Sequence, residues 1–444
     1  MNKEFHKKQN FFSFSDIDSE RKDRIMKFTS TEATPAPHVP PGVLRLTGAA
    51  KEDIPMYRIQ TMNKISPVGL NRFPSELYEV GDAVQDPQGI LVRSAKLLDL
   101  EFNPSLLAIA RAGVGVNNIP LDRCAAAGIP VFSTPGANAN AVKELVICAM
   151  LMGSRDIPGA IRWVREQAAS GVDVSTVVEK GKSAFIGPEL YKKTLGIIGL
   201  GAIGSIVANT AISLGMDVYG YDPFLSVDTA LRLDRHVHVV KDINDLYKRS
   251  DYITMHIHYT EKTARMIDAS AIAAMKRGVR VINLARGEIV DDEAMLTALD
   301  TGMVAAYITD FPNNRLLTAP HVIAMPHLGA STPESEQNCA AMAVDTLRDY
   351  LESGNIRSSV NLPEMTMDRS GVQRLCVLHK NVPGMLANIT SLFGREGVNV
   401  ENLSNKSRGD YAYTMVDLGS KVGDNVIEDV RRTANVIRVR SLEW

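Results

Sequence analysis

The sequence is poor in cysteine and in long apolar runs, and each shortage excludes a class of protein. Its four cysteines are scattered and form no CxxC pair: Cys124, Cys148, Cys339 and Cys376. This scatter is typical of thiols in a reducing compartment, rather than of a disulfide framework or a zinc site. No apolar run approaches the roughly 18 residues that a membrane span needs, and the N-terminus lacks the apolar core of a signal peptide. We therefore expect a cytoplasmic protein with no membrane anchor.

An excess of either charge is also missing. The chain has 49 Lys and Arg against 51 Asp and Glu, a net charge of -2, with no basic block. Nucleic acid and anionic membranes are therefore not expected as partners. The histidine pairs His236/His238 and His256/His258 alternate along the chain, so each pair splits across two faces, and no metal site is expected.

What the chain does have is length and globular composition. With 444 residues, of which 45% are hydrophobic, it predicts two or three domains. Residues 1–55 differ from the rest, because they mix charged clusters with a Pro-rich stretch, 33–41. Such a segment buries little apolar surface. We predict a disordered extension with Met56 as the functional start, the alternative being a small ordered cap.

From residue 57 the pattern alternates short apolar strands with helices, which is typical of parallel β-α-β units in doubly wound sheets. Strands are expected at 57–61, 89–93, 106–111, 129–132, 195–199, 216–221, 252–256, 279–283, 304–308 and 322–325, and helices at 142–151, 205–213 and 336–351. After a linker at 355–370, residues 371–444 read as β-α-β-β-α-β, which predicts a small ferredoxin-like domain.

A glycine-rich turn supplies the clearest motif. Gly199-Leu-Gly201-Ala202-Ile203-Gly204 follows a predicted strand and opens a predicted helix, and Asp222 ends the next strand. Glycines at these positions permit a tight turn, close approach to a pyrophosphate and close helix packing, while the helix N-terminus offers free N–H groups. A carboxylate at 222 accepts hydrogen bonds from ribose hydroxyls and repels a 2′-phosphate. The motif therefore predicts NAD rather than NADP.

Two side chains suited to 2-hydroxy acid chemistry follow later strands. Arg286 comes just after the strand at 279–283, and His327 just after the strand at 322–325. Arginine binds a carboxylate in bidentate fashion, and histidine moves a proton near neutral pH. Taken alone, each could be a surface or core residue. Downstream of a dinucleotide motif, they predict hydride transfer.

These motifs resemble the D-isomer-specific 2-hydroxyacid dehydrogenases, and within them the enzymes that act on 3-phospho-D-glycerate. The matching segments are 111–118, 134–138, 195–204, 283–287 and 326–332. The resemblance implies that Arg286 holds the substrate carboxylate and that His327 carries the proton. It also implies a flavodoxin-like substrate lobe (56–151 and 327–354) beside a Rossmann-type NAD lobe (152–326). Further cofactor contacts are expected at Leu284, Ala285, Arg286, Asp310, His327 and Gly329.

One departure concerns the partner of the histidine. The family carries a glutamate hydrogen-bonded to it, but the segment Thr309-Asp310-Phe-Pro-Asn-Asn314 places an asparagine there. An amide can orient an imidazole but cannot stabilise an imidazolium by charge. We therefore predict either a histidine that titrates lower than in the usual dyad or an acidic substitute such as Asp310.

The substrate and regulation are inferred from the same resemblance. Arg93 and Ser94 match the phosphate-binding segment, and Gly113 and Asn138 lie in neighbouring matched loops, so we expect 3-phospho-D-glycerate as substrate in the first step of the phosphorylated route to L-serine. The segment from Leu375 resembles the ACT module, which predicts an L-serine effector held by His379, Asn381 and Asn399, and a homodimer or homotetramer. The module could instead serve only to dimerise the chain.

Two other functions stay open at this point. The first is a dehydrogenase for an unphosphorylated 2-hydroxy acid of the glyoxylate or hydroxypyruvate type. The second is a non-catalytic NAD-sensing scaffold, which the replaced glutamate favours and the retained Arg286 and His327 oppose.

Overall fold

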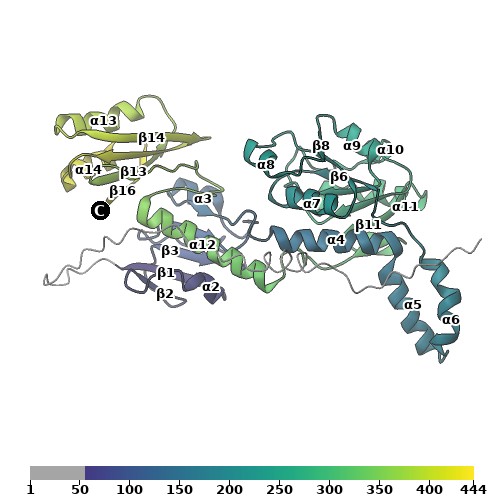
Figure 1. Ribbon diagram of the computed structural model, residues 1–444. Helices are drawn as coiled ribbons and strands as arrows, with labels where there is room; N and C mark the ends of the chain where they lie inside the picture. The colour runs from purple at the N-terminus through teal and green to yellow at the C-terminus, as the bar shows by residue number, and fades with distance from the viewer. Residues whose placement is uncertain (1–55) are drawn as a thin grey trace, which may run out of the picture. The chain divides into compact units, whose positions relative to one another are not determined.

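The computed structural model describes residues 56–444, which form three β-sheets with their helices (Figure 1). The predicted extension at 1–55 lies outside the described residues. Two sheets are parallel and one is antiparallel, so the predicted fold class is confirmed. Within residues 56–444, no helix has the length and apolar character to cross a membrane.

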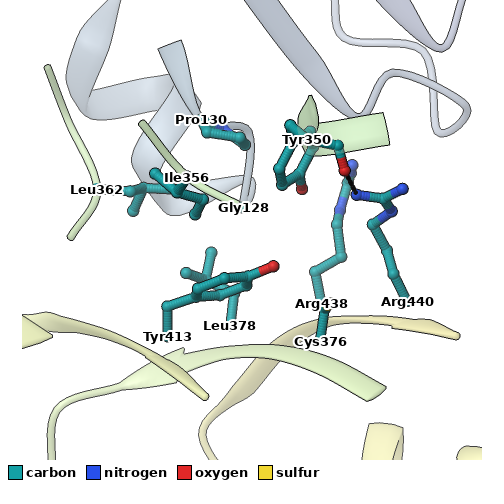
Figure 2. Close-up of a pocket in the computed structure, with 10 residues that line it drawn as sticks. All are labelled: Gly128, Pro130, Tyr350, Ile356, Leu362, Cys376, Leu378, Tyr413, Arg438 and Arg440. Carbon is teal, nitrogen blue, oxygen red and sulfur yellow. Dashed lines mark hydrogen bonds between the residues drawn. The ribbon is translucent and has the colours of Figure 1, made fainter. Parts of the chain in front are cut away.

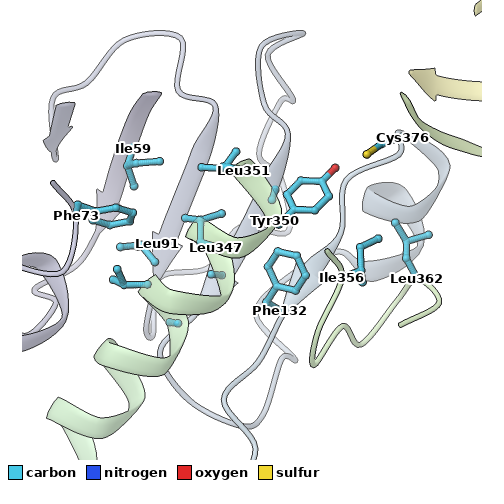
Figure 3. Packing of buried hydrophobic residues seen from close by; sticks show 14 of the residues in the cluster. Ile59, Phe73, Leu91, Phe132, Leu347, Tyr350, Leu351, Ile356, Leu362 and Cys376 are labelled. Atoms are coloured by element: carbon cyan, nitrogen blue, oxygen red, sulfur yellow. The ribbon is translucent and has the colours of Figure 1, made fainter. Parts of the chain in front are cut away.

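The first sheet has five parallel strands in the flavodoxin-like order β2-β1-β3-β4-β5. Its strands are β1 (Tyr57–Met62), β2 (Tyr78–Gly81), β3 (Gly89–Val92), β4 (Ala108–Arg111) and β5 (Val131–Phe132). The short helices α2 (Pro67–Leu70) and α3 (Leu121–Ala126) connect them. The long helix α12 (Pro333–Ser353) returns to this sheet and packs Leu347, Tyr350 and Leu351 into its core (Figure 3).

The second sheet has seven parallel strands in the order β12-β11-β10-β9-β6-β7-β8. They are β6 (Thr194–Ile198), β7 (Asp217–Tyr221), β8 (Val237–Val240), β9 (Tyr252–Met255), β10 (Val279–Asn283), β11 (Val304–Thr309) and β12 (Val322–Ala324). Its helices are α7 (Ala202–Ser213), α8 (Val227–Arg232), α9 (Ile243–Arg249), α10 (Ala269–Ala273) and α11 (Asp292–Asp300), with 3-10 turns η2 (Gly287–Ile289) and η3 (Leu316–Thr318). The order reverses between β6 and β9, the kind of switch point where such sheets bind nucleotides.

Helix α4 (Ala139–Arg155) follows the first sheet in sequence, yet its Val142, Val146 and Met150 lie in the core of the second. The lobe boundary expected near residue 151 falls inside this helix and stays a prediction. Three further elements follow: α5 (Ile157–Ala169), α6 (Val174–Gly181) and the turn η1 (Lys182–Phe185). None of these three has a buried residue.

The third sheet is antiparallel, in the order β14-β15-β13-β16. Its elements are β13 (Gln373–Lys380), α13 (Met385–Arg395), β14 (Val400–Arg408), β15 (Tyr411–Leu418), α14 (Asp424–Arg432) and β16 (Val436–Glu443). This is the predicted β-α-β-β-α-β order. Alternate residues of β13, among them Leu375 and Val377, pack with the helices, because side chains of a strand point to opposite faces.

The other face of the third sheet is bonded to the C-terminal end of α12, and we call these contacts the arginine clamp. Arg440 donates to the carbonyls of Tyr350 and Leu351, Arg374 to that of Ser353, and the Tyr413 hydroxyl to that of Gly354. The last carbonyls of a helix have no partner within the helix and carry partial negative charge. The two arginines of the clamp therefore supply cationic donors to the carbonyls of the last turn of α12.

Apolar packing completes this junction. Cys376 and Leu378 of β13 and Tyr413 of β15 share one core with α12 and with Ile356 and Leu362 of the linker (Figures 2 and 3). The cavity between these residues has a volume of about 10 Å³, close to the minimum for a single water molecule. The junction is a packed interface that leaves no space for a ligand.

Candidate active site

The glycine-rich turn has the geometry of a pyrophosphate cradle. Gly199 has φ 91°, and a Cβ there would lie 2.6 Å from the His256 carbonyl oxygen. A Cβ at Gly204 would lie 1.9 Å from the Gly199 carbonyl oxygen, whereas one at Gly201 would meet nothing within 4 Å. The first and third glycines are thus required by the fold, and the second borders open space at the N-terminus of α7. Ala202 and Ile203 form the first turn of that helix. These features fit a bound dinucleotide.

Asp222 fixes this turn from the end of β7. One carboxylate oxygen accepts a hydrogen bond from the Leu200 N–H at 2.9 Å, and the other accepts from the Phe224 N–H at 2.8 Å. The carboxylate is only partly buried, so it can also accept hydrogen bonds from ribose hydroxyls.

Arg286 lies on a turn that a buried amide holds in place. Asn283, the last residue of β10, is fully buried; its amide donates to the Arg286 carbonyl at 2.9 Å and accepts from the Ala285 N–H at 3.1 Å. Leu284 and Ala285 are buried, which leaves Arg286 as the polar side chain at this strand end. Its Nη2 is 3.5 Å from where a Cβ at Gly115 would stand, so the guanidinium faces the loop after β4.

His327 is exposed and lies beside Phe311, the two ring centroids being 4.6 Å apart. The Arg286 guanidinium lies over the same Phe311 ring, 5.6 Å from its centroid. One aromatic side chain therefore contacts both predicted catalytic residues. Sequence reasoning did not single out Phe311; its position just after Asp310, at the end of a strand next to β10, was the available signal.

Asp310 follows β11 and is 1% exposed. Neither of its carboxylate oxygens has a hydrogen-bond partner among the described residues. A Cβ at the buried Gly329 would be 3.8 Å from one of these oxygens. Burial raises the pKa of Asp310, and the imidazole of His327 opposes that shift, as do the backbone N–H groups of Asp310 and Gly329 and the guanidinium of Arg286.

The positive charges of Arg93 and Arg286 both act on the guanidinium of Arg111. Burial lowers the pKa of Arg111, and the positive charges of Arg93 and Arg286 lower it further, although Cys339 acts against the shift. Arg111 also donates to the Arg93 carbonyl at 3.0 Å. Gly113 is needed beside it, since a Cβ there would lie 2.4 Å from the Arg111 guanidinium. The site therefore concentrates positive charge from segments that are far apart in sequence.

The remaining predicted substrate residues lie on loops of the first sheet. Arg93 forms an ion pair with Glu336, in the first turn of α12, at 2.5 Å. Ser94 is exposed, and its N–H donates to the side chain of Asn63 at 3.1 Å. The side-chain oxygens of Asn138 and Thr134 are buried without a hydrogen-bond partner among residues 56–444. Sequence reasoning did not assign Thr134.

The loop between β11 and β12 is bonded to α11 rather than to His327. The Asn313 amide donates to Asp292 at 2.7 Å, and Arg315 pairs with Glu293 at 2.8 Å. Asn314, at the position of the expected glutamate, is exposed. A hollow of about 710 Å³ borders this loop on the side of Gly287 and Phe311.

The three predicted effector residues are not brought together within one copy of the chain. His379 is buried, and its ring nitrogens contact Thr414 Oγ1 at 2.9 Å and the Lys380 carbonyl at 2.8 Å. Asn381 follows the end of β13, whereas Asn399 precedes β14, whose first residue is in register with the start of β13. The two asparagines therefore lie at opposite ends of the sheet, roughly 25 Å apart at 3.3 Å per strand residue.

Comparisons with known proteins agree with this geometry. A family model described as D-isomer specific 2-hydroxyacid dehydrogenase, NAD binding domain, matches residues 147–329, and one described as AHAS small subunit-like ACT domain matches residues 375–438. The predictions of NAD as cofactor and of an ACT domain are thereby confirmed.

Curated relatives extend the similarity beyond these two segments. The D-3-phosphoglycerate dehydrogenase of Synechocystis sp. is 36% identical over 326 residues, 71% of this chain, but the chain spans only 56% of that relative's length. The D-3-phosphoglycerate dehydrogenase of Escherichia coli K12 is 31% identical over 380 residues, which cover 82% of this chain and 89% of the relative.

A solved structure gives the same result. The NAD+-bound 3-phosphoglycerate dehydrogenase of Entamoeba histolytica aligns with a TM-score of 0.54 at 26% identity and covers 69% of this chain and 99% of its own. Since the Escherichia coli relative is matched over nearly its whole length at more than 30% identity, the chain belongs to the D-isomer specific 2-hydroxyacid dehydrogenase family.

Proposed function

We propose that the chain oxidises 3-phospho-D-glycerate to 3-phosphohydroxypyruvate with NAD, the first step of the phosphorylated route to L-serine. The observation that carries this proposal is the placement of three arginines: Arg111, at the end of β4, donates to the Arg93 carbonyl at 3.0 Å, and the Arg286 guanidinium faces the loop that follows β4. A substrate with a carboxylate at one end and a phosphate at the other requires several cationic donors, and guanidinium groups bind both anions in bidentate fashion.

In this proposal each predicted residue has one task. Arg286 binds the substrate carboxylate, held in place by Asn283. Arg93, with Ser94 and Asn138, binds the phosphate, and Arg93 exchanges its Glu336 partner for the substrate. His327 accepts the proton of the substrate hydroxyl. The turn from Gly199 to Gly204 holds the pyrophosphate of NAD, which when bound accepts the hydride.

The ion pair between Arg93 and Glu336 favours a second candidate function. A carboxylate already bound to Arg93 reduces the positive charge available to a phosphate. A dehydrogenase for an unphosphorylated 2-hydroxy acid therefore remains the alternative. The scaffold hypothesis is the third, supported by the uncharged Asn314.

Regulation by L-serine forms part of the proposal, with the effector bound between two copies of the chain. Asn381 and Asn399 lie at opposite ends of the sheet, so one ligand can contact both only if the second comes from another copy. His379 would have to release Thr414 or the Lys380 carbonyl in order to contact the ligand. A homodimer or homotetramer follows from this arrangement.

The test is NADH formation by the full chain with 3-phospho-D-glycerate and with D-glycerate, each with and without L-serine. We expect turnover of the phosphorylated acid only, and Arg93→Ala should raise its KM by at least about tenfold, the effect of losing about 1.4 kcal/mol of binding. Arg58→Ala, on β1, is the matched control and should leave the KM unchanged. Equal use of D-glycerate, or an unaffected Arg93→Ala variant, would refute the phosphate assignment.

A further inference from the structure

Asp310 is a buried carboxylate that lacks the partners such a group ordinarily has. It is 1% exposed, and neither oxygen has a hydrogen-bond partner of ordinary geometry between residues 56 and 444, although the backbone N–H groups of Asp310 and Gly329 lie close enough to lower its pKa. Removing a carboxylate from water without a partner costs several kcal/mol, so unsatisfied groups of this kind are rare and cluster at functional sites. Asp310 is buried in this state at the carboxyl end of β11, close to the two predicted catalytic residues.

The groups around Asp310 indicate what the carboxylate faces. Against the effect of burial, the imidazole of His327 and the guanidinium of Arg286 both lower the pKa of Asp310. Burial raises the pKa of Tyr307, and Asp310 raises it further. Tyr307 Oη lies 3.3 Å from the Asn283 amide and is therefore already engaged. The geometry favours His327: its ring lies 4.6 Å from that of Phe311, the residue after Asp310, and a Cβ at Gly329, two residues after His327, would stand 3.8 Å from Asp310 Oδ2. The Arg286 guanidinium faces the loop at Gly115 instead.

Asn314 does not compete for this task. It is exposed, and both neighbours, Asn313 and Arg315, are bonded to α11 through Asp292 and Glu293. Moving Asn314 toward His327 would require these contacts to break. In this chain the loop that matches the family's glutamate segment is therefore bonded to α11, and not to His327.

We propose that Asp310 is the positioning carboxylate of His327, taking the task that the residue at 314 does not perform. The inference rests on the proposed function, in which His327 accepts the hydroxyl proton. When the substrate O–H bond breaks, the proton moves to the imidazole, and the hydrogen on the same carbon leaves with its electron pair to NAD. In this role the Asp310 carboxylate supplies the negative charge that stabilises the imidazolium.

The competing role for Asp310 is a contact to the carboxamide of the cofactor. The two roles predict different effects of Asp310→Asn. Loss of a positioning carboxylate makes His327 hold its proton more weakly and leaves NADH binding unchanged. Loss of a cofactor contact weakens NADH binding and leaves the imidazole titration unchanged.

The decisive measurement is an NMR titration of the full chain labelled with 13C-histidine, in which the His327 signal is identified by its absence from His327→Asn. We expect the titration midpoint of His327 to fall by about one pH unit or more in Asp310→Asn, the effect of losing an opposite charge nearby. Asp310→Glu, which keeps the charge, should restore most of the shift. Asp300→Asn, an exposed acid at the end of α11, is the matched control and should change nothing.

Kinetics give the second readout. The acid limb of the kcat profile for oxidation should move to lower pH in Asp310→Asn, with NADH affinity unchanged by fluorescence titration; Asn314→Ala should move neither. An unmoved His327 midpoint would overturn the inference, as would a normal pH profile with weakened NADH binding. Asp310→Ser serves as a second neutral variant if the asparagine variant does not fold. Because the NMR titration needs no turnover, failure to oxidise 3-phospho-D-glycerate would refute the proposed function and leave this inference testable.

Discussion

Neutralising Asp417 tests how firmly the ACT domain is joined to the rest of the chain. Arg374 and Asp417 form an ion pair with both side chains 0% exposed. Arg374 Nε donates to one carboxylate oxygen at 2.6 Å, and Nη2 donates to the other at 2.8 Å. The guanidinium also donates to the carbonyls of Ser353, Met367 and Asp368 at 2.9 to 3.0 Å, so all five of its N–H groups are engaged.

Asp417→Asn leaves the guanidinium buried without its counter-charge. Breaking a buried pair from one side costs about 3–5 kcal/mol, because the remaining charge stays desolvated. We expect a loss of that size in the free energy of unfolding. In Arg374→Met with Asp417→Leu both charges are gone, and the loss should be smaller than the sum of the single losses.

Urea unfolding followed by circular dichroism and by Trp444 fluorescence measures this loss. Trp444 lies under the guanidinium groups of Arg369 and Arg374, 4.8 and 5.3 Å from its ring centroid, so its emission reports on this region once Trp163 is replaced by Phe. Glu443→Gln, which breaks the exposed pair with Lys421, is the matched control and should cost less than about 1 kcal/mol. A cost below about 1 kcal/mol for Asp417→Asn, or a Trp444 transition that precedes loss of the circular dichroism signal in the parent chain, would refute the reasoning.

Two other predictions concern the dinucleotide turn. Gly204→Ala should weaken NADH binding at least about tenfold in a fluorescence titration, since its Cβ would stand 1.9 Å from a backbone oxygen. Gly201→Ala should weaken NADH binding without lowering the midpoint of thermal unfolding, because a Cβ there meets no other atom within 4 Å. A lowered thermal midpoint in Gly201→Ala would contradict the open space at that position. Burial lowers the pKa of His256, beside the turn, to about 4. As the pH falls from 6.5 to 4, the histidine is therefore protonated in the unfolded chain before it is protonated in the folded chain, and this difference lowers the free energy of unfolding. Above pH 6.5 the histidine is neutral in both states and causes no such loss. His256→Asn should therefore lose less stability than the parent chain between pH 6.5 and 4, by urea unfolding; equal losses would show that His256 is not the group responsible.

The parallel sheets and the dinucleotide turn could be predicted because their signals are local. An apolar strand, a run of spaced glycines and a following helix lie within a few residues of one another, as do each strand end and its Arg286 or His327. Hydrophobic periodicity and turn chemistry specify such units without knowledge of the rest of the chain.

Elements with exposed or polar faces were predicted less well. The second strand of the β-α-β-β-α-β order predicted for residues 371–444 is β14, Val400–Arg408. Its polar residues carry little hydrophobic signal because it is an edge strand. Helices α5 and α6 have no buried residues and drew no prediction.

The candidate site could be predicted only in part, because some of its features depend on segments that are far apart in the sequence. Arg93, Arg111 and Arg286 come from three strand ends, and no spacing in the sequence shows that their charges converge. The unpartnered state of Asp310 depends on burial by other segments. Arg438 and Arg440 alternate with Val439, a pattern that predicts a solvent-facing side, yet Arg440 is 9% exposed because the end of α12 lies against it.

The arginine clamp bears on how this chain could gain or lose residues 355–444 during evolution. A cut after Gly354 would remove the arginine donors from the carbonyls of Tyr350, Leu351 and Ser353, leaving the Gly354 N–H on the first and the Tyr57 hydroxyl on the second. It would also expose Phe132 and Tyr350 to water. A shortened descendant would need compensating substitutions on the retained part before it could fold. The ACT domain and the first sheet are therefore joined by a shared core and by hydrogen bonds to the end of α12.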